Sequence, residues 1–112
     1  MFFLREYENQ GFEQNPADYV LLGLEFIGTC GSFPEQYDVV KDIAGMRYQV
    51  GYVRLRGGKF SVYSPDLGYP RAPVFQHTFE ETMGCFKDED TRLKYLAVAA
   101  KVINYELINL KE

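Results

Sequence analysis

Hydrophobic residues recur at helical spacing near the C-terminal end of the chain. Six of them follow one another in steps of three or four residues: Leu93, Leu96, Ala100, Ile103, Leu107 and Leu110. This is the period of one face of an α-helix. Asp88 precedes the run as a good N-cap, and Glu89 and Asp90 fall in the first turn, where the helix dipole favours acids. The pattern predicts a long helix that ends at about Asn109.

The middle of the chain alternates apolar and polar residues with the period of a β-strand. The alternation is clearest over 47–56, where apolar residues occupy even positions up to Tyr52 and odd positions from Val53 onward. A phase slip beside Gly51 is typical of a β-bulge. The glycine pair at 57–58 then predicts a tight hairpin, because glycine tolerates positive φ.

Further strands are expected over 35–41, 59–64 and 74–79. Turns at 31–34 and 42–45 flank the first of them. Pro73 limits where pairing can resume, so 74–79 is expected at a sheet edge.

The segment 19–28 is open to two interpretations. Asn15 and Pro16 are suited to starting a helix, but Gly23 and Gly28 disfavour one. We favour a buried strand over 19–27.

Strands come in a run and the helix comes last, which predicts a single α+β domain over 1–112 rather than βαβ units. We expect an antiparallel sheet of four to five strands, a meander of hairpins, with the long C-terminal helix packed on one face.

The charge of this chain of 112 residues is −4 overall and is unevenly placed. Residues 1–45 carry eight acids and two bases, residues 46–73 five bases and one acid, and residues 74–112 seven acids and five bases. The overall sign disfavours direct nucleic-acid binding and contact with anionic membranes. The apolar runs are too short for a membrane span or an export signal, so we expect a cytoplasmic protein.

Residues that support catalysis are few. His77 is the only histidine, and no serine or cysteine stands at a motif spacing from it. Cys30 and Cys85 are interpreted as two free thiols, although one disulfide between them stays open. The segment 57–59 lacks the spacing of a phosphate-binding loop, and no ligand-spaced carboxylate cluster occurs. We therefore expect no cofactor, no metal and no enzymatic activity.

The only basic cluster consists of Arg47, Arg54 and Arg56, with Lys59 across the predicted hairpin. Arg54, Arg56 and Lys59 are candidate anion-binding residues, with Tyr52 and Tyr63 close in sequence. The alternative is a solvated sheet face whose arginines pair with nearby acids, either from 35–38 or from the helix.

The acidic N-terminal third carries a candidate surface for a basic protein partner. Carboxylates steer such a partner and tyrosines supply stiff contact area. The candidate residues are Glu13, Tyr19, Glu35, Tyr37, Asp38 and Asp42. The alternative is ordinary solubilising charge.

These features favour a small acidic binding protein that neutralises or regulates a basic protein partner. Immunity proteins against toxin nucleases work in this way, and the likeness is one of class, size and charge. A second hypothesis is a homodimer or larger assembly through the broad apolar helix face, which includes Tyr105 and Ile108. A third is a small enzyme or anionic-ligand binder that uses Arg54 and Arg56 with His77.

Overall fold

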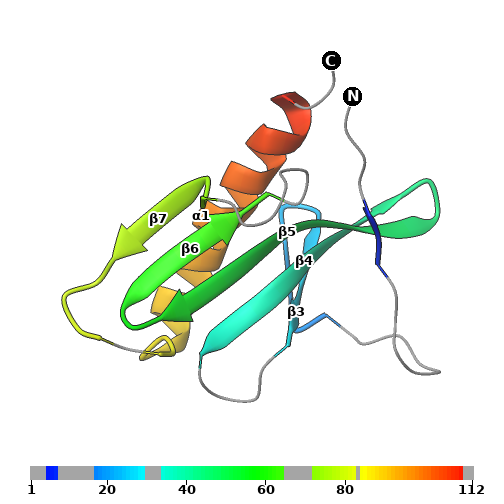
Figure 1. Ribbon diagram of the computed structural model, residues 1–112. Helices are drawn as coiled ribbons and strands as arrows, with labels where there is room; N and C mark the ends of the chain where they lie inside the picture. The colour runs from blue at the N-terminus through cyan, green and yellow to red at the C-terminus, as the bar shows by residue number, and fades with distance from the viewer. Residues whose placement is uncertain (1–4, 8–16, 30–33, 65–71, 83, 110–112) are drawn as a thin grey trace.

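The chain forms a meander of antiparallel strands with one long helix packed against it (Figure 1). The computed structural model describes residues 5–7, 17–29, 34–64, 72–82 and 84–109. Its elements are β1 (Arg5–Glu6), β2 (Tyr19–Leu21), β3 (Leu24–Gly28), β4 (Glu35–Ile43), β5 (Met46–Arg56), β6 (Lys59–Tyr63), β7 (Phe75–Thr78) and α1 (Glu89–Asn109).

The predicted α+β class and the meander are confirmed. Strands β2 to β7 neighbour one another in chain order, and the two-residue strand β1 pairs with β5. The sheet has more strands than expected, because the segment 19–28 is a hairpin rather than one strand. Leu22 and Gly23 turn the chain with φ of 52° and 81°. A leucine rarely adopts positive φ, so only Gly23 marks this turn in the sequence.

The two later hairpins turn at residue pairs with positive φ. Ala44 and Gly45 join β4 to β5, and Gly57 and Gly58 join β5 to β6 as predicted. Gly58 also approaches the backbone closely, because a Cβ there would overlap the carbonyl oxygen of Glu81. Glycine is therefore required at this position for two reasons: its positive φ, and the lack of space for a Cβ.

The phase slip in β5 is a β-bulge. Val39 of β4 lies opposite Gly51, and Val40 lies opposite Gln49, so Val50 is an extra residue in the ladder. The bulge lies beside Gly51, where the sequence predicted it.

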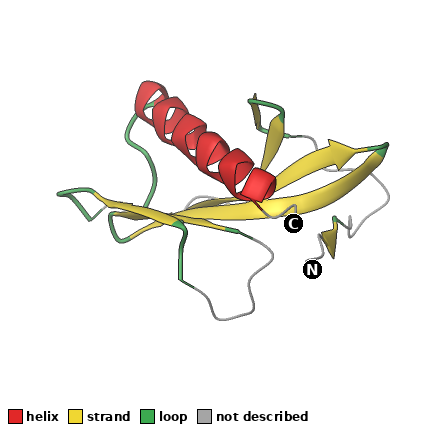
Figure 2. Cartoon of the chain, turned by 90° about the horizontal axis from the view of Figure 1, so that it is seen from above, coloured by secondary structure: helices red, strands yellow, loops and turns green. Residues whose placement is uncertain are grey.

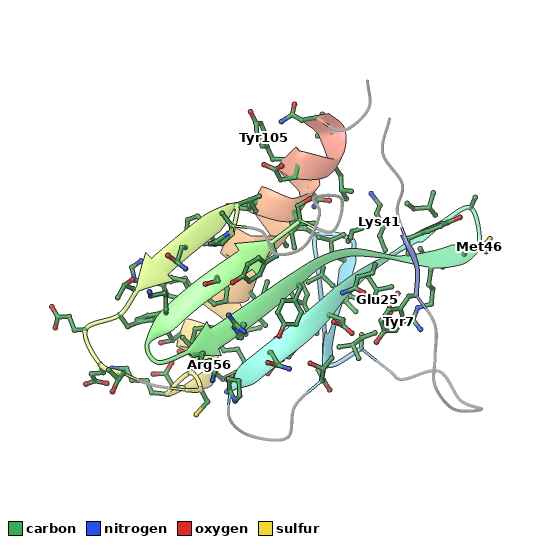
Figure 3. The ribbon with its side chains drawn as sticks, in the orientation of Figure 1. Tyr7, Glu25, Lys41, Met46, Arg56 and Tyr105 are labelled. Atoms are coloured by element: carbon green, nitrogen blue, oxygen red, sulfur yellow. The ribbon has the colours of Figure 1, made fainter. Side chains whose placement is uncertain are left out.

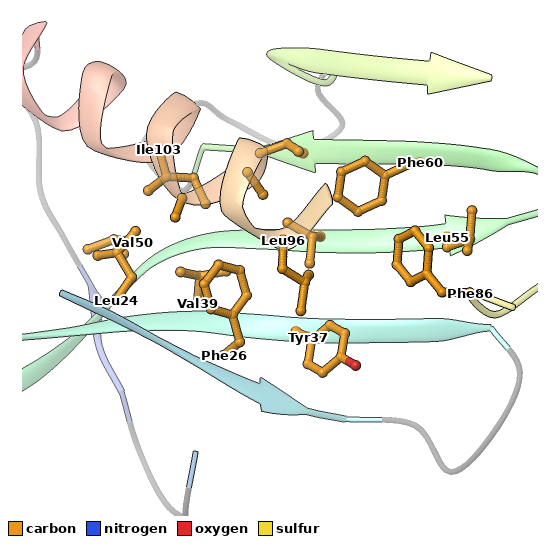
Figure 4. Packing of buried hydrophobic residues seen from close by; sticks show 14 residues of the cluster. Leu24, Phe26, Tyr37, Val39, Val50, Leu55, Phe60, Phe86, Leu96 and Ile103 are labelled. Atoms are coloured by element: carbon orange, nitrogen blue, oxygen red, sulfur yellow. The ribbon is translucent and has the colours of Figure 1, made fainter. Parts of the chain in front are cut away.

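Helix α1 covers one face of the sheet, and the described residues place no helix on the opposite face (Figure 2). The predicted N-cap is confirmed, since the carboxylate of Asp88 accepts a 2.7 Å hydrogen bond from the Thr91 amide. Strands β3 to β6 and α1 enclose a common core (Figure 4). Its members are Leu24, Phe26, Tyr37, Val39, Val50, Val53, Leu55, Phe60, Val62, Phe86, Leu96, Ala99, Ala100 and Ile103.

Only part of the apolar stripe of the helix packs into this core. Leu96, Ala100 and Ile103 are buried, whereas Tyr105 and Ile108 are 64% and 67% exposed. None of the helices in the described ranges has the length and apolar content needed to cross a membrane.

Candidate binding face on the outer side of the sheet

The side of the sheet turned away from α1 is called the outer face here. The strand registers arrange its side chains over β4 to β7 in three rows that run across the strands. The rows are Asp38–Tyr52–Tyr63, then Gln36–Arg54–Ser61–Gln76, then Arg56–Lys59–Thr78.

Alternation along β5 separates core from surface as predicted. Val53 and Leu55 are buried against the helix, whereas Arg54 is half-buried and Arg56 exposed on the outer face. The bulge at Val50 extends this surface, because it lets odd residues before it and even residues after it share one face.

The middle of the outer face combines an arginine with two tyrosines. The Tyr52 and Tyr63 rings pack with centroids 5.9 Å apart at an interplanar angle of 41°. The Arg54 guanidinium donates a 3.4 Å hydrogen bond from Nη2 to the Tyr63 hydroxyl. In the same row, the Gln76 amide donates a 2.9 Å hydrogen bond to the Ser61 hydroxyl. These groups form a polar and aromatic surface held by neighbouring strands.

Two cations lie opposite each other at the end of the β5–β6 hairpin. Arg56 pairs with Lys59 across the strands, and both are exposed. Like charges in directly opposed positions destabilise an antiparallel pair. The hairpin therefore folds with an unfavourable local contact.

The half of the outer face near β1 is different, because Arg47 and Asp38 have polar partners there, among them Glu25 and Tyr7, which Figure 3 labels. Arg47 forms a 2.8 Å ion pair with Glu25, and its guanidinium lies 5.5 Å from the centre of the Tyr7 ring. Asp38 accepts hydrogen bonds from the Tyr7 hydroxyl at 3.3 Å and from the Gln49 amide at 3.1 Å. Burial raises the pKa of Asp38, although these two hydrogen bonds oppose the shift.

No such carboxylate reaches the other cations of this face. Among the residues that the structure describes, none of Arg54, Arg56 and Lys59 has an acidic group within 4.0 Å. We call these three residues, together with Tyr52 and Tyr63, the basic platform. The alternative interpretation, in which its arginines pair with Glu35, Asp38 or the helix acids, is not met among the described residues.

Glu35 and Tyr37 lie on the opposite side of the sheet, buried under the helix. The Glu35 carboxylate accepts hydrogen bonds from the Phe86 amide at 2.9 Å, from the Tyr37 hydroxyl and from the Arg92 guanidinium. Burial acts to raise the pKa of Glu35, but the bonds from Arg92, Tyr37 and Phe86 outweigh it, and the pKa lies below its ordinary value. Burial and the neighbouring Glu35 carboxylate raise the pKa of Tyr37.

The remaining residues of the predicted acidic surface lie apart from one another. Asp38 is half-buried on the outer face, and Asp42 is exposed near the tip of the β4–β5 hairpin. The Tyr19 hydroxyl donates to the Glu89 carboxylate at 2.9 Å, on the helix side. Glu13 lies outside the described residues. The structure does not bring the predicted residues together as one surface, because strand alternation sends Glu35 and Tyr37 to the face opposite Asp38.

The predicted partnership of His77 with the arginines is not formed either. His77 lies beside Phe60 in the β6–β7 register and therefore faces the helix, while Arg54 faces outward. Its ring packs edge-on against the Phe79 ring, with the ring centroids 4.7 Å apart, and its Nε2 lies 3.3 Å from the Tyr95 hydroxyl. The histidine thus belongs to an aromatic cluster at the β7 edge.

The thiols and carboxylates do not assemble a site in the described part of the chain. Cys85 is a half-buried free thiol, and Cys30 lies outside the described residues. No group of three or more histidine, cysteine or acidic side chains there is placed to hold a metal ion.

An open hollow of about 370 Å³ lies between the end of β7 and the first turns of α1. It is lined by Phe79, Glu80, Glu81, Lys87, Thr91, Lys94 and Tyr95. Its rim mixes acids and lysines, so it selects neither sign of charge.

Sequence reasoning identified the cations of the platform but not its polar row. Gln36, Ser61 and Gln76 become neighbours of Arg54 only through the registers of three hairpins. A register is not readable from any one strand, so no local signal marks these residues.

Comparison of the chain with protein-family models, with curated proteins and with solved structures finds no match in any of the three.

Proposed function

We propose that this protein is a non-catalytic binding protein that docks a protein partner on the outer face of its sheet and regulates it by occupying the partner's surface. The observation that carries the proposal is the basic platform. Three cations without an acidic partner among the described residues lie beside two packed tyrosines on the face opposite α1.

The composition of the platform supports binding to a protein. Arginine and tyrosine are enriched among the residues that dominate protein interfaces, because each combines a broad apolar surface with hydrogen-bonding groups. The rows extend over four strands, which is roughly 15 Å at the usual strand spacing. A patch of this width fits the centre of an interface of about 800 Å² per partner.

The separation of the reactive side chains supports a role without catalysis. His77 lies in the aromatic cluster on the helix side, and the platform arginines lie on the outer face. A general base must reach the proton that it abstracts, and the sheet stands between these groups.

The expectation of a basic partner depended on a continuous acidic surface with tyrosines. Because Glu35 and Tyr37 are buried, that surface loses two of its members. The sign of the platform therefore becomes the better guide to the partner.

The proposal is tested by comparing what the intact protein captures from cells that express it. Arg54→Ala combined with Tyr63→Ser alters the platform, and Lys94→Ala combined with Lys101→Ser alters the exposed side of α1 as a control. We expect the same partner with the wild type and the control, and its loss with the platform variant. An identical set of proteins from all three, with unchanged circular dichroism, would contradict the proposal.

A homodimer through α1 is the second candidate, favoured by the exposed Tyr105 and Ile108. Light scattering on the purified protein distinguishes it, because a homodimer has twice the monomer mass and Ile108→Lys would reduce that mass to the monomer value.

A further inference from the structure

We infer that the basic platform binds an extended acidic segment of its partner, in which two carboxylates are separated by one residue and an aromatic or apolar residue stands two positions beyond the acid that faces Arg54. This inference rests on the proposed function and names the chemistry of the partner.

The spacing of the arginines sets the spacing of the carboxylates. Arg54 and Arg56 are two residues apart in β5 and on the same face, which corresponds to roughly 6.6 Å along the strand. Side chains at alternate positions of an extended peptide have the same spacing. An acid at every second position therefore places one carboxylate over each arginine.

Arg54 retains donors for a ligand. A guanidinium carries five N–H groups in a planar fork, and the described contact of Arg54 is its single hydrogen bond to the Tyr63 hydroxyl. A carboxylate accepts two parallel bonds from such a fork. Because Arg54 is half-buried, the pair would form in surroundings less polar than bulk water.

The Arg56–Lys59 pair supports an anionic occupant independently. The two cations face each other across the hairpin, which costs stability in the free protein. A carboxylate bound between them relieves that repulsion. The free energy that the repulsion costs the free protein then contributes to binding. On the same face, Arg47 is already neutralised by Glu25 and offers no such gain.

The opposite end of the platform determines which kind of side chain should come after the two acids. Tyr52 is the next outer-face residue of β5 before Arg54, and it packs against Tyr63. The pair presents aromatic surface at the position that a third alternate side chain of the segment would reach. Beside Tyr52 in the same row lies Asp38, a carboxylate that repels further negative charge at this position.

Asp38 also favours an acidic peptide over a nucleic acid. A uniform polyanion that crosses the platform would place a phosphate near this carboxylate, in a protein with a net charge of −4. A segment with only two acids places an uncharged side chain beside Asp38 and avoids the repulsion.

The test measures binding of labelled peptides to the intact protein by fluorescence anisotropy. The probe peptide has two glutamates separated by one threonine, with a tyrosine two positions after the second glutamate. A permuted peptide has the glutamates adjacent, a third has lysines in their place, and an oligothymidylate serves as the nucleic acid. We expect the probe to bind at least about tenfold more tightly than the permuted and lysine peptides.

The contribution of the platform is tested with matched charge reversals. Arg56→Glu with Lys59→Glu should weaken binding of the probe at least about tenfold. Lys94→Glu with Lys101→Glu makes the same change in net charge on the exposed side of α1 and should leave binding unchanged. Equal weakening by both double variants would show a general charge effect and overturn the inference.

The outcomes separate this inference from the proposed function. Tighter binding of the lysine peptide or of the oligothymidylate overturns the acidic-segment inference. If no probe binds but Arg54→Ala with Tyr63→Ser still abolishes capture from cells, the inference fails and the proposed function stands. If neither capture nor probe binding depends on the platform, both fail.

Discussion

Arg92 and Glu35 are 57 positions apart in the chain, and their ion pair joins the first turns of α1 to the first residue of β4. The Arg92 side chain is 21% exposed and that of Glu35 is 9% exposed. The same carboxylate accepts the Phe86 amide just before the helix. One acidic group therefore fixes where the helix begins on the sheet.

Glu35→Ala should destabilise the protein by about 2–4 kcal/mol, because it removes the buried acceptor of Arg92 and leaves the buried Phe86 amide unpaired. The free energy of unfolding from urea titration measures the loss. Glu89→Ala is the control, since Glu89 also contacts Arg92 but is 53% exposed. It should cost about 0.3–0.5 kcal/mol, and equal losses for the two variants would show that the buried contacts of Glu35 add nothing.

Stability should fall in acid through Glu35. Its pKa in the folded protein lies below the ordinary value of 4.5, so it stabilises the fold above that pH and the contribution is lost as pH falls through the folded pKa. Urea titrations between roughly pH 5 and pH 3 should show a shallower decline for Glu35→Gln than for the wild type. Parallel curves would show that another acid controls the transition.

Asp38 should act with the opposite sign. Burial raises its pKa above the ordinary value of 3.8, so its ionisation destabilises the fold as pH rises through that range. Asp38→Asn should therefore be more stable than the wild type at neutral pH, and the difference should shrink toward pH 3. A variant that is less stable at neutral pH would show that the Tyr7 and Gln49 bonds outweigh burial.

Gly51 makes room for the helix at the bulge. A Cβ at this position would lie 2.6 Å from Cδ1 of Ile103, whose side chain is buried. Gly51→Ala should cost about 1–3 kcal/mol through this overlap.

The overlap predicts a compensating pair. Ile103→Val removes Cδ1 and alone should cost about 0.5–1.5 kcal/mol. The Gly51→Ala, Ile103→Val double variant should lose less than the two single losses together, by about 0.5 kcal/mol or more. Additive losses in urea titration would mean that Ile103 is not what Gly51 accommodates.

The opposed cations of the β5–β6 hairpin predict a trade between stability and binding. Lys59→Glu converts the contact with Arg56 from repulsion to attraction and should raise the free energy of unfolding by about 0.2–1 kcal/mol. The same change should weaken binding of the acidic probe peptide. Lys101 lies on the exposed side of α1, so Lys101→Glu should not combine a higher free energy of unfolding with weaker binding of the probe peptide.

The elements with strong local signals were predictable from the sequence. The α1 cap at Asp88, the glycine turn at 57–58 and the phase slip at Gly51 each follow from backbone preferences of a few neighbouring residues. The turn at Leu22 was not predictable, because a leucine rarely adopts the positive φ that it has there.

The candidate site was only half predictable, for a related reason. Alternation along β5 placed Arg54 and Arg56 on one face. Alternation along β4 also puts Glu35 on the face of Tyr37, but its burial depends on Arg92 in a distant helix. A carboxylate looks like surface in a sequence until its partner is located in space.

The bulge at Val50 determines which residues of β5 face outward on each side of it. Arg47 occupies an odd position and Arg54 an even one, and they share the outer face only because one supernumerary residue stands between them. Deleting that residue would turn half of the strand over, so that either the Arg47 half or the Arg54 half pointed into the core. Length at this one place is therefore under stricter constraint than residue identity, and the chain should tolerate many replacements of Val50 better than its loss.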